Sequence, residues 1–393
     1  MKQKSVFGFP QNVFILSFVS FLNDIGGQTI KYAIPLFLSN ALGVKTSVIG
    51  LVEGIGESTP TLFQPVSGYL SDKFKKRKPL VVFGQIIRSS IIFLFFASSW
   101  WIVLLIRFLD RTGKGIQGSP RDALLSASAE KNKQGKAFGL SRMFDNAGAV
   151  VGLFLAGIIT LLAAKGTFTL STAVFRYIVL LAVIPVITAS ILLYKYLQDI
   201  KINKERLVVK SPNSLGGKYY IFLIIMFIFT LGNSSDAFLI LKAQKTGMNI
   251  SSIFFLLATF SLVASVTSLP IGIISDKIGR KKLLLSGWIL YTFVYIGFAR
   301  SSQIIEIIGL FLLYGIYYGL TEGVAKAYVA DIVPPNKKGT AFGLYNLVIG
   351  GTLLPASLIA GYLWQVFSPA TSFYFGGILA MVASVGFYLF TKY

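Results

Sequence analysis

The sequence predicts an all-α integral membrane protein with twelve transmembrane helices, arranged as two parallel six-helix bundles. Three observations predict this class: an apolar composition, a succession of apolar segments of spanning length, and an internal repeat. The chain has 393 residues, of which 54% are hydrophobic and only 13% are charged. Soluble chains carry about 25% charged residues. The composition therefore indicates a protein that lies mostly in lipid.

The apolar segments have the length that a bilayer requires, about 20 residues for each helix. Six are expected near residues 11–38, 46–71, 79–98, 101–128, 137–163 and 174–197. A second six are expected near residues 219–241, 250–275, 282–299, 303–329, 338–366 and 372–391. We therefore predict an N-terminal bundle over 1–197, a cytoplasmic connector over 198–218 and a C-terminal bundle over 219–393.

The positive charge follows the predicted loops. The net charge is +22, which in a soluble protein would favour nucleic-acid binding. If the N-terminus is cytoplasmic, the inside segments hold twenty-three Lys and Arg and the outside segments hold five. Basic loops stay on the cytoplasmic side of a membrane. We therefore expect two cytoplasmic termini, a plasma-membrane location and no nucleic-acid partner.

Two stretches of the first half return in the second half. GYLSDKFKKRKPL at Gly68 returns as GIISDKIGRKKLL at Gly272, and GKAFGL at Gly135 returns as GTAFGL at Gly339. Each of the two stretches returns 204 positions after its first occurrence. A shared offset, with six predicted helices in each half, indicates two repeats of the same orientation.

The repeated loop resembles the signature of the major facilitator superfamily, which lies between helices 2 and 3 of that family. Lys75 replaces the inner glycine of the signature, and the second copy keeps it as Gly279. The resemblance implies transport by alternating access, driven by an ion gradient with no cofactor, in a monomer. It also implies a cytoplasmic latch between the halves; the alternative is a basic loop that only sets orientation. The latch residues are Gly68, Asp72, Lys73, Arg77, Gly272, Asp276 and Arg280.

The fifth segment resembles in part the antiporter motif of the same family. Gly139, Gly148 and Gly152 have the spacing of that motif, whereas Leu153 replaces its proline. Small residues at this spacing also fit close helix packing. Both interpretations stay open.

Carboxylates inside the apolar segments are candidate proton carriers, because a charge at bilayer depth is costly and is usually functional. Asp24 lies about 20 Å along the first segment at about 1.5 Å per residue. Glu53 and Glu57 are four residues apart on one face, so that both resist being ionised together. They suit a proton carrier, or else pair with Arg88, Arg107 or Arg111. The chain has no histidine, so proton coupling must use carboxylates, with Lys or Tyr as further candidates.

Further polar side chains in the segments are candidates to line a substrate cavity. Arg107, Arg111 and Lys114 share a helix face, and Asp110 is placed to pair with Lys114. Tyr314, Tyr317 and Tyr318 either line a cavity or pack against lipid and helices. The cavity candidates are Asn23, Gln28, Arg107, Asp110, Arg111, Lys114, Arg142, Asp145, Asn233, Asp236 and Glu322.

These features favour a secondary transporter of a small molecule. Proton-coupled export of drug-like, amphipathic compounds is the first hypothesis, from the partial motif and the aromatic content. The alternative is a small anionic metabolite held by Arg107, Arg111 and Lys114. A receptor or lipid-handling protein on the same fold is a hypothesis of another class. An enzyme or a metal site is not expected, since the chain lacks cysteine and histidine and shows no nucleotide-binding motif.

Overall fold

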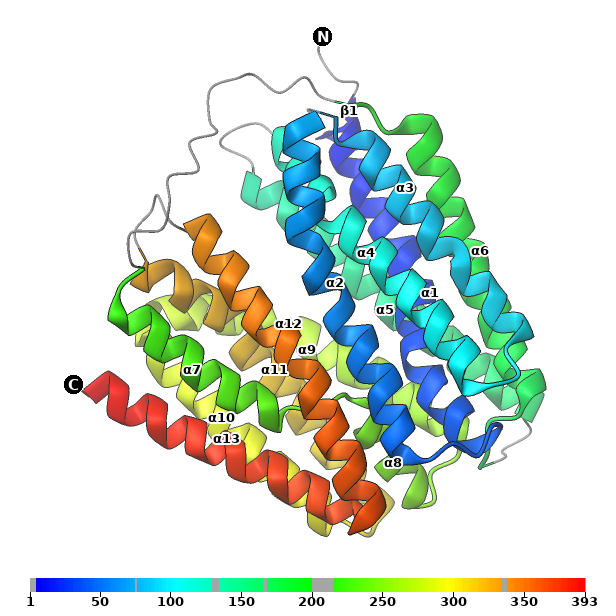
Figure 1. The fold of residues 1–393 in the computed structure, drawn as a ribbon, viewed down its shortest axis with the longest axis vertical. Helices are drawn as coiled ribbons and strands as arrows, with labels where there is room; N and C mark the ends of the chain where they lie inside the picture. The colour runs from blue at the N-terminus through cyan, green and yellow to red at the C-terminus, as the bar shows by residue number, and fades with distance from the viewer. Residues whose placement is uncertain are drawn as a thin grey trace. The chain divides into compact units, whose positions relative to one another are not determined.

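The computed structural model describes residues 5–74, 76–128, 134–164, 168–199, 215–333 and 338–392. Within these ranges the protein is helical, which confirms the predicted class (Figure 1). One feature was not predicted: a short antiparallel pair of strands, β1 (Ser5–Val6) and β2 (Phe9–Pro10), precedes the first helix. Two residues per strand give no periodic pattern from which the sequence could predict them.

The chain forms two compact units. The first comprises Met1–Gly43 and Thr59–Leu207, and the second comprises Val44–Ser58 and Val208–Tyr393. Helix α2 (Thr46–Phe74) therefore contributes its first part to the second unit and the rest to the first. Residues 200–214 of the predicted connector lie outside the described ranges. The division at 197 and 219 stays a prediction.

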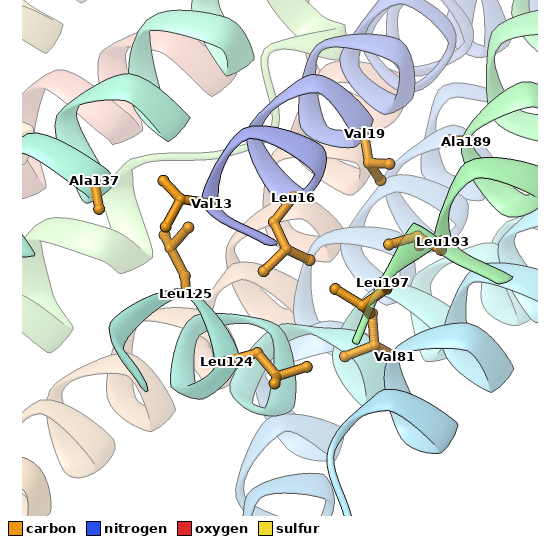
Figure 2. Close-up of a cluster of buried hydrophobic side chains, with 10 residues drawn as sticks. All are labelled: Val13, Leu16, Val19, Val81, Leu124, Leu125, Ala137, Ala189, Leu193 and Leu197. Carbon is orange, nitrogen blue, oxygen red and sulfur yellow. The ribbon is translucent and has the colours of Figure 1, made fainter. Parts of the chain in front are cut away.

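The first unit is built around its first helix, which packs on α5 and α6. Its elements are α1 (Gln11–Asn40), the rest of α2, α3 (Lys78–Arg88), the 3-10 helix η1 (Ser89–Phe96), α4 (Trp100–Ser128), α5 (Gln134–Ala164) and α6 (Thr172–Tyr196). Figure 2 shows the apolar core at one end of α1, where Leu16 points between Leu124 and Leu193. Buried side chains of five helices meet there, and burying each Leu or Val stabilises the unit by about 1.5–3 kcal/mol.

The second unit has seven complete helices. They are α7 (Gly217–Gly232), α8 (Ala237–Lys245), α9 (Ile250–Ile278), α10 (Arg280–Arg300), α11 (Ile304–Ile332), α12 (Lys338–Val366) and α13 (Pro369–Lys392). Helix α10 packs on α11 and α13, α9 packs on α11, and α7 packs on α12 and α13. The predicted segments agree with these helices closely, with one exception.

The exception is the segment predicted over 219–241, which lies within one candidate membrane span, Gly217–Lys245, but whose helix is interrupted. Helix α7 ends at Gly232 and α8 begins at Ala237. The intervening sequence is Asn-Ser-Ser-Asp, whose short polar side chains offer the backbone alternative hydrogen bonds. Ala237 N donates to Ser235 Oγ at 3.2 Å, so this serine caps the second helix. The break places polar groups inside the second unit.

Ten segments of the described residues are long and apolar enough to cross a membrane. Helices α2 and α4, of 29 residues each, are not among them. Both carry several charged residues, which lower their hydropathy. These two helices supply many of the candidate site residues, as expected where intramembrane charge has a function.

Candidate functional site: two polar clusters, one in each unit

A buried ionic cluster joins α3 and α4 in the first unit. Arg88 Nε lies 3.6 Å from Asp110 Oδ1, and Arg111 Nε lies 3.7 Å from Asp110 Oδ2. All three residues are at most 8% exposed. Asp110 therefore bridges two guanidinium groups, one of which, Arg88, was not among the predicted site residues.

A close helix crossing sets this geometry. A Cβ on Gly113 would lie 2.5 Å from the Gly84 carbonyl oxygen and 2.9 Å from Arg88 N. Only glycine permits such an approach of two backbones. The crossing brings the last residue of α3, Arg88, against the α4 turn that carries Asp110. Neither glycine of this contact was among the predicted site residues.

Asp24 of α1 lies near the same cluster. A Cβ on Gly27 would lie 3.6 Å from Arg88 Nη2 and 4.0 Å from Asp24 Oδ1, so both groups border this glycine. The preceding residue, Asn23, exchanges two hydrogen bonds with Gln85 of α3, at 2.9 and 2.8 Å. This buried amide pair fixes α1 on α3 beside the charges. Asp24 itself is half-buried.

The predicted basic residues of α4 differ in how deeply they are buried. Arg107 is 1% exposed, whereas Lys114 is exposed. Gln28 of α1 is half-buried. The buried part of the predicted basic face is therefore Arg107 and Arg111, and Arg111 shares Asp110 with Arg88.

A second ionic group joins α1, α4 and α5. Arg121 donates to Ser20 and, at 2.7 Å, to Ser141 Oγ. Its guanidinium also lies 3.8 Å from Asp145, which pairs with Arg142 at 3.9 Å. Arg142 and Asp145 therefore belong to a structural tie around Arg121.

The two glutamates of α2 fall in the second unit. Glu53 is 1% exposed and accepts a hydrogen bond from Ser235 Oγ at 3.4 Å, while Glu57 is half-buried. This part of α2 packs closely on α12, since a Cβ on Gly50 would lie 2.4 Å from the Ser357 carbonyl oxygen. Glu53 thereby reaches the break between α7 and α8.

At this break, tyrosines surround a buried aspartate. Asp236 is 8% exposed, and its Oδ1 accepts from Tyr314 at 3.0 Å and from Tyr318 at 3.5 Å. Tyr291 donates to the Gly232 carbonyl at 3.1 Å and to Asn233 Oδ1 at 3.3 Å, satisfying the end of α7. We call the five tyrosines of α10 and α11 the tyrosine cluster: Tyr291, Tyr295, Tyr314, Tyr317 and Tyr318.

The rings of the tyrosine cluster pack on one another. Tyr291 and Tyr295 stack with centroids 4.1 Å apart, and Tyr314 stands edge-on to Tyr318 at 5.1 Å. Four of the five are buried, so they do not face lipid. Sequence reasoning missed Tyr291 and Tyr295, although their spacing of four residues places them on one helix face. Glu322, a predicted cavity residue on α11, is exposed.

The latch residues make contacts within each unit. Gly68 of α2 packs against Ser119 of α4, Lys73 is exposed, and Arg77 donates to the Ala123 carbonyl at 2.9 Å. Arg280 pairs with Asp331 at 3.0 Å. The Asp72 and Asp276 side chains and the surroundings of Gly272 lie outside the described part of the chain. A latch between the halves stays a prediction.

The glycines of the fifth segment are packing positions. A Cβ on Gly148 would lie 2.3 Å from the Phe21 carbonyl oxygen, and one on Gly152 would lie 2.3 Å from that of Ile25. They let α5 pack directly on α1. These contacts account for the two glycines without an antiporter motif, and an antiport role stays a prediction.

Comparisons with known proteins agree with this architecture. The family model of the Major Facilitator Superfamily matches residues 16–239 and again residues 221–393. An uncharacterized MFS-type transporter of Methanocaldococcus jannaschii is 37% identical, over 95% of this chain and 94% of its own. The multi-drug resistance efflux pump PmrA of Streptococcus pneumoniae is 23% identical, over 89% of each chain.

Solved structures give the same result for the fold. A POT family transporter in complex with 5-aminolevulinic acid superposes with a TM-score of 0.83 at 12% identity, covering 100% of this chain and 98% of that one. The family match spans nearly the whole chain, in two copies. The chain therefore belongs to the Major Facilitator Superfamily and is a multi-pass membrane protein of the secondary-transporter class.

Proposed function

We propose that this protein couples proton entry to the export of drug-like, amphipathic compounds across the plasma membrane. Carboxylates buried or half-buried in the helices carry the proposal: Asp24, Glu53, Glu57 and Asp236. Histidine is absent, so acidic side chains are the natural proton carriers. Alternating access then exchanges the bound proton and the compound between the two sides.

The tyrosine cluster supports an amphipathic substrate. Tyrosine offers an apolar ring and a hydroxyl, so a wall of tyrosines suits compounds with an aromatic body and a polar end. Tyr318 is the half-buried member of the cluster and is the one placed to contact a ligand. The likeness to a multi-drug efflux pump, at 23% identity, agrees with this substrate class.

A small anionic metabolite is the second candidate, and one observation favours it. Among the described residues, the buried charges of the first unit are Arg88, Arg107 and Arg111 against Asp110 alone. Guanidinium groups bind carboxylate and phosphate with two parallel hydrogen bonds. If an anion is the cargo, Arg107 and Arg111 are expected to hold it.

Flux in proteoliposomes tests the proposal. Purified protein, reconstituted in vesicles with an imposed pH gradient, is given aromatic amphipathic dyes in one arm and small carboxylates in the other. We expect the dyes to move in the direction opposite to proton flow, and we expect no movement of the carboxylates. Carboxylate flux alone would move the assignment to the second candidate, and no flux for either set would contradict transport of both classes.

Two variants test proton coupling separately from transport. Asp24→Asn and Glu57→Gln are expected to abolish proton-driven accumulation but to leave dye exchange without a gradient. Lys326→Gln, which changes a half-buried base on α11, is the control, and we expect it to keep proton coupling. Unchanged coupling in both acidic variants would remove these carboxylates from the proposal.

A further inference from the structure

A groove opens at the end of the second unit where α9 passes into α10. Its volume is about 740 Å³. Gly279 reverses the chain there with φ at +94°, a conformation that favours glycine, and the three bases that follow open α10. The groove is also lined by the ends of α11 and α13, through Tyr328 and Tyr388. None of its lining residues belongs to either polar cluster.

The lining combines basic and apolar surfaces. Arg280, Lys281 and Lys282 line it, and Asp331 is the one acid among the described residues of the lining. Ile278 and Tyr388, which also line it, are 49% and 52% exposed. An exposed apolar wall beside a basic rim has the chemistry of a membrane interface, where a headgroup meets acyl chains.

We propose that this groove binds an anionic phospholipid, with the phosphate held by Lys281, Lys282 and Arg280 and the acyl chains along Ile278 and Tyr388. The positive-inside distribution predicts that this loop faces the cytoplasm, where anionic lipid is concentrated. Asp331 limits the affinity, because it lies 3.0 Å from Arg280 and occupies one guanidinium edge.

The internal repeat supplies a comparison within the same molecule. Lys281 corresponds to Arg77 at the offset of 204 residues. Arg77 is engaged by its own unit, since it donates to the Ala123 carbonyl at 2.9 Å and its backbone N donates to Asp199 at 3.2 Å. Lys281, in contrast, is exposed in the groove. At this position both loops carry a base, but only that of the first loop is held by its own unit.

Native mass spectrometry of the purified full chain in detergent tests the proposal, with dioctanoyl phosphatidylglycerol as the probe. The double variant Lys281→Gln/Lys282→Gln is expected to bind it about tenfold or more weakly, since a base near an anionic headgroup contributes about fivefold. Asp331→Asn releases Arg280 and is expected to bind the probe a fewfold more tightly. If the ion pair between Arg280 and Asp331 had only a structural role, Asp331→Asn would not bind the lipid more tightly.

Matched controls separate a site from general charge. Lys76→Gln/Lys78→Gln removes the same charge from the first loop and is expected to change binding less than twofold. Dioctanoyl phosphatidylcholine is expected to bind at least tenfold more weakly than phosphatidylglycerol. Equal loss in both double variants, equal binding of the two lipids, or displacement of the lipid by an equal concentration of inorganic phosphate would overturn the proposal.

Discussion

The two units differ in the sign and the partners of their buried charges. Among the described residues, the first unit buries three arginines and one aspartate, whereas the second buries Glu53 and Asp236 and no base. Asp110 is held by guanidinium groups, while the two acids of the second unit accept hydrogen bonds from Ser235 and from tyrosines.

This difference bears on which acids can carry a proton. Protonation of Asp110 would leave Arg88 and Arg111 without their anionic partner, at a cost of several kcal/mol. Hydroxyl groups can donate or accept, so they can remain hydrogen-bonded to an acid in either protonation state. We infer that Asp110 is a fixed ionic hub and that Glu53 and Asp236 are better suited than Asp110 to gain and lose a proton.

The largest expected effect is that of Asp110→Asn. Removing the charge takes away the carboxylate that Arg88 and Arg111 share, and breaking a buried pair costs about 3–5 kcal/mol. We expect a correspondingly large fall in the free energy of unfolding, measured by denaturant titration of the purified protein in detergent.

The control is Asp122→Asn on the same helix, whose side chain is 59% exposed and pairs with Arg121 at 3.4 Å. An exposed pair contributes about 0–1 kcal/mol. If both variants lose the same stability, Asp110 is not an ionic hub and the contrast between the units fails.

The next effect tests the helix crossings that position the clusters. Gly113→Ala would push α3 from α4, because its Cβ would meet the Gly84 carbonyl and Arg88. Overpacking of this kind costs about 1–3 kcal/mol. Gly376→Ala is the counterpart in the second unit, since its Cβ would lie 2.5 Å from the Gly232 carbonyl oxygen beside the α7 break.

Gly309→Ala on α11 is the matched control, because nothing lies within 4 Å of a Cβ at that position. It is expected to keep the melting temperature of the parent protein, whereas the two crossing variants melt earlier. Parent-like melting of Gly113→Ala would show that the close crossing does not hold Arg88 in place.

These crossings also mark the limit of what the sequence predicts. The helices were predicted well because their length and apolar character are local properties. The Gly84–Gly113 contact joins residues 29 positions apart on different helices, and nothing in the local pattern of either reveals the other. Arg88 was therefore known as a candidate partner of Glu53 and Glu57, but its place beside Asp110 was not.

The second cluster shows a different limit. Asp236 was predicted as a cavity residue, but the polar residues before it were counted as part of a continuous helix. Whether such a stretch breaks the helix depends on the groups that satisfy its backbone, here Tyr291 and Ser357. Those groups come from α10 and α12, so the break is a tertiary property.

A smaller effect on stability is expected for Asp236→Asn. Asparagine keeps an acceptor for Tyr314, so a hydrogen bond to a charged group, which contributes about 1.5–3 kcal/mol, is exchanged for a neutral one, which contributes about 0.5–1.5 kcal/mol. Proton-driven flux in proteoliposomes is nevertheless expected to fall, because the amide cannot take up a proton. Full coupling in this variant would remove Asp236 from the proton pathway and leave Asp24, Glu53 and Glu57 as its candidates.

The smallest expected effects rank the donors to Asp236. Tyr314 donates at 3.0 Å and is 1% exposed, whereas Tyr318 donates at 3.5 Å and is half-buried. Tyr314→Phe is expected to cost about 1 kcal/mol, and Tyr318→Phe less, because a long hydrogen bond near water is replaced easily. Denaturant titration measures both. The ranking depends on the Asp236 carboxylate lying closer to Tyr314 than to Tyr318. A larger loss of stability for Tyr318→Phe would mean that the carboxylate lies closer to the half-buried Tyr318. In that arrangement Asp236 would contact the transported compound directly, and Tyr318→Phe would alter the apparent affinity for the dye more than it alters stability.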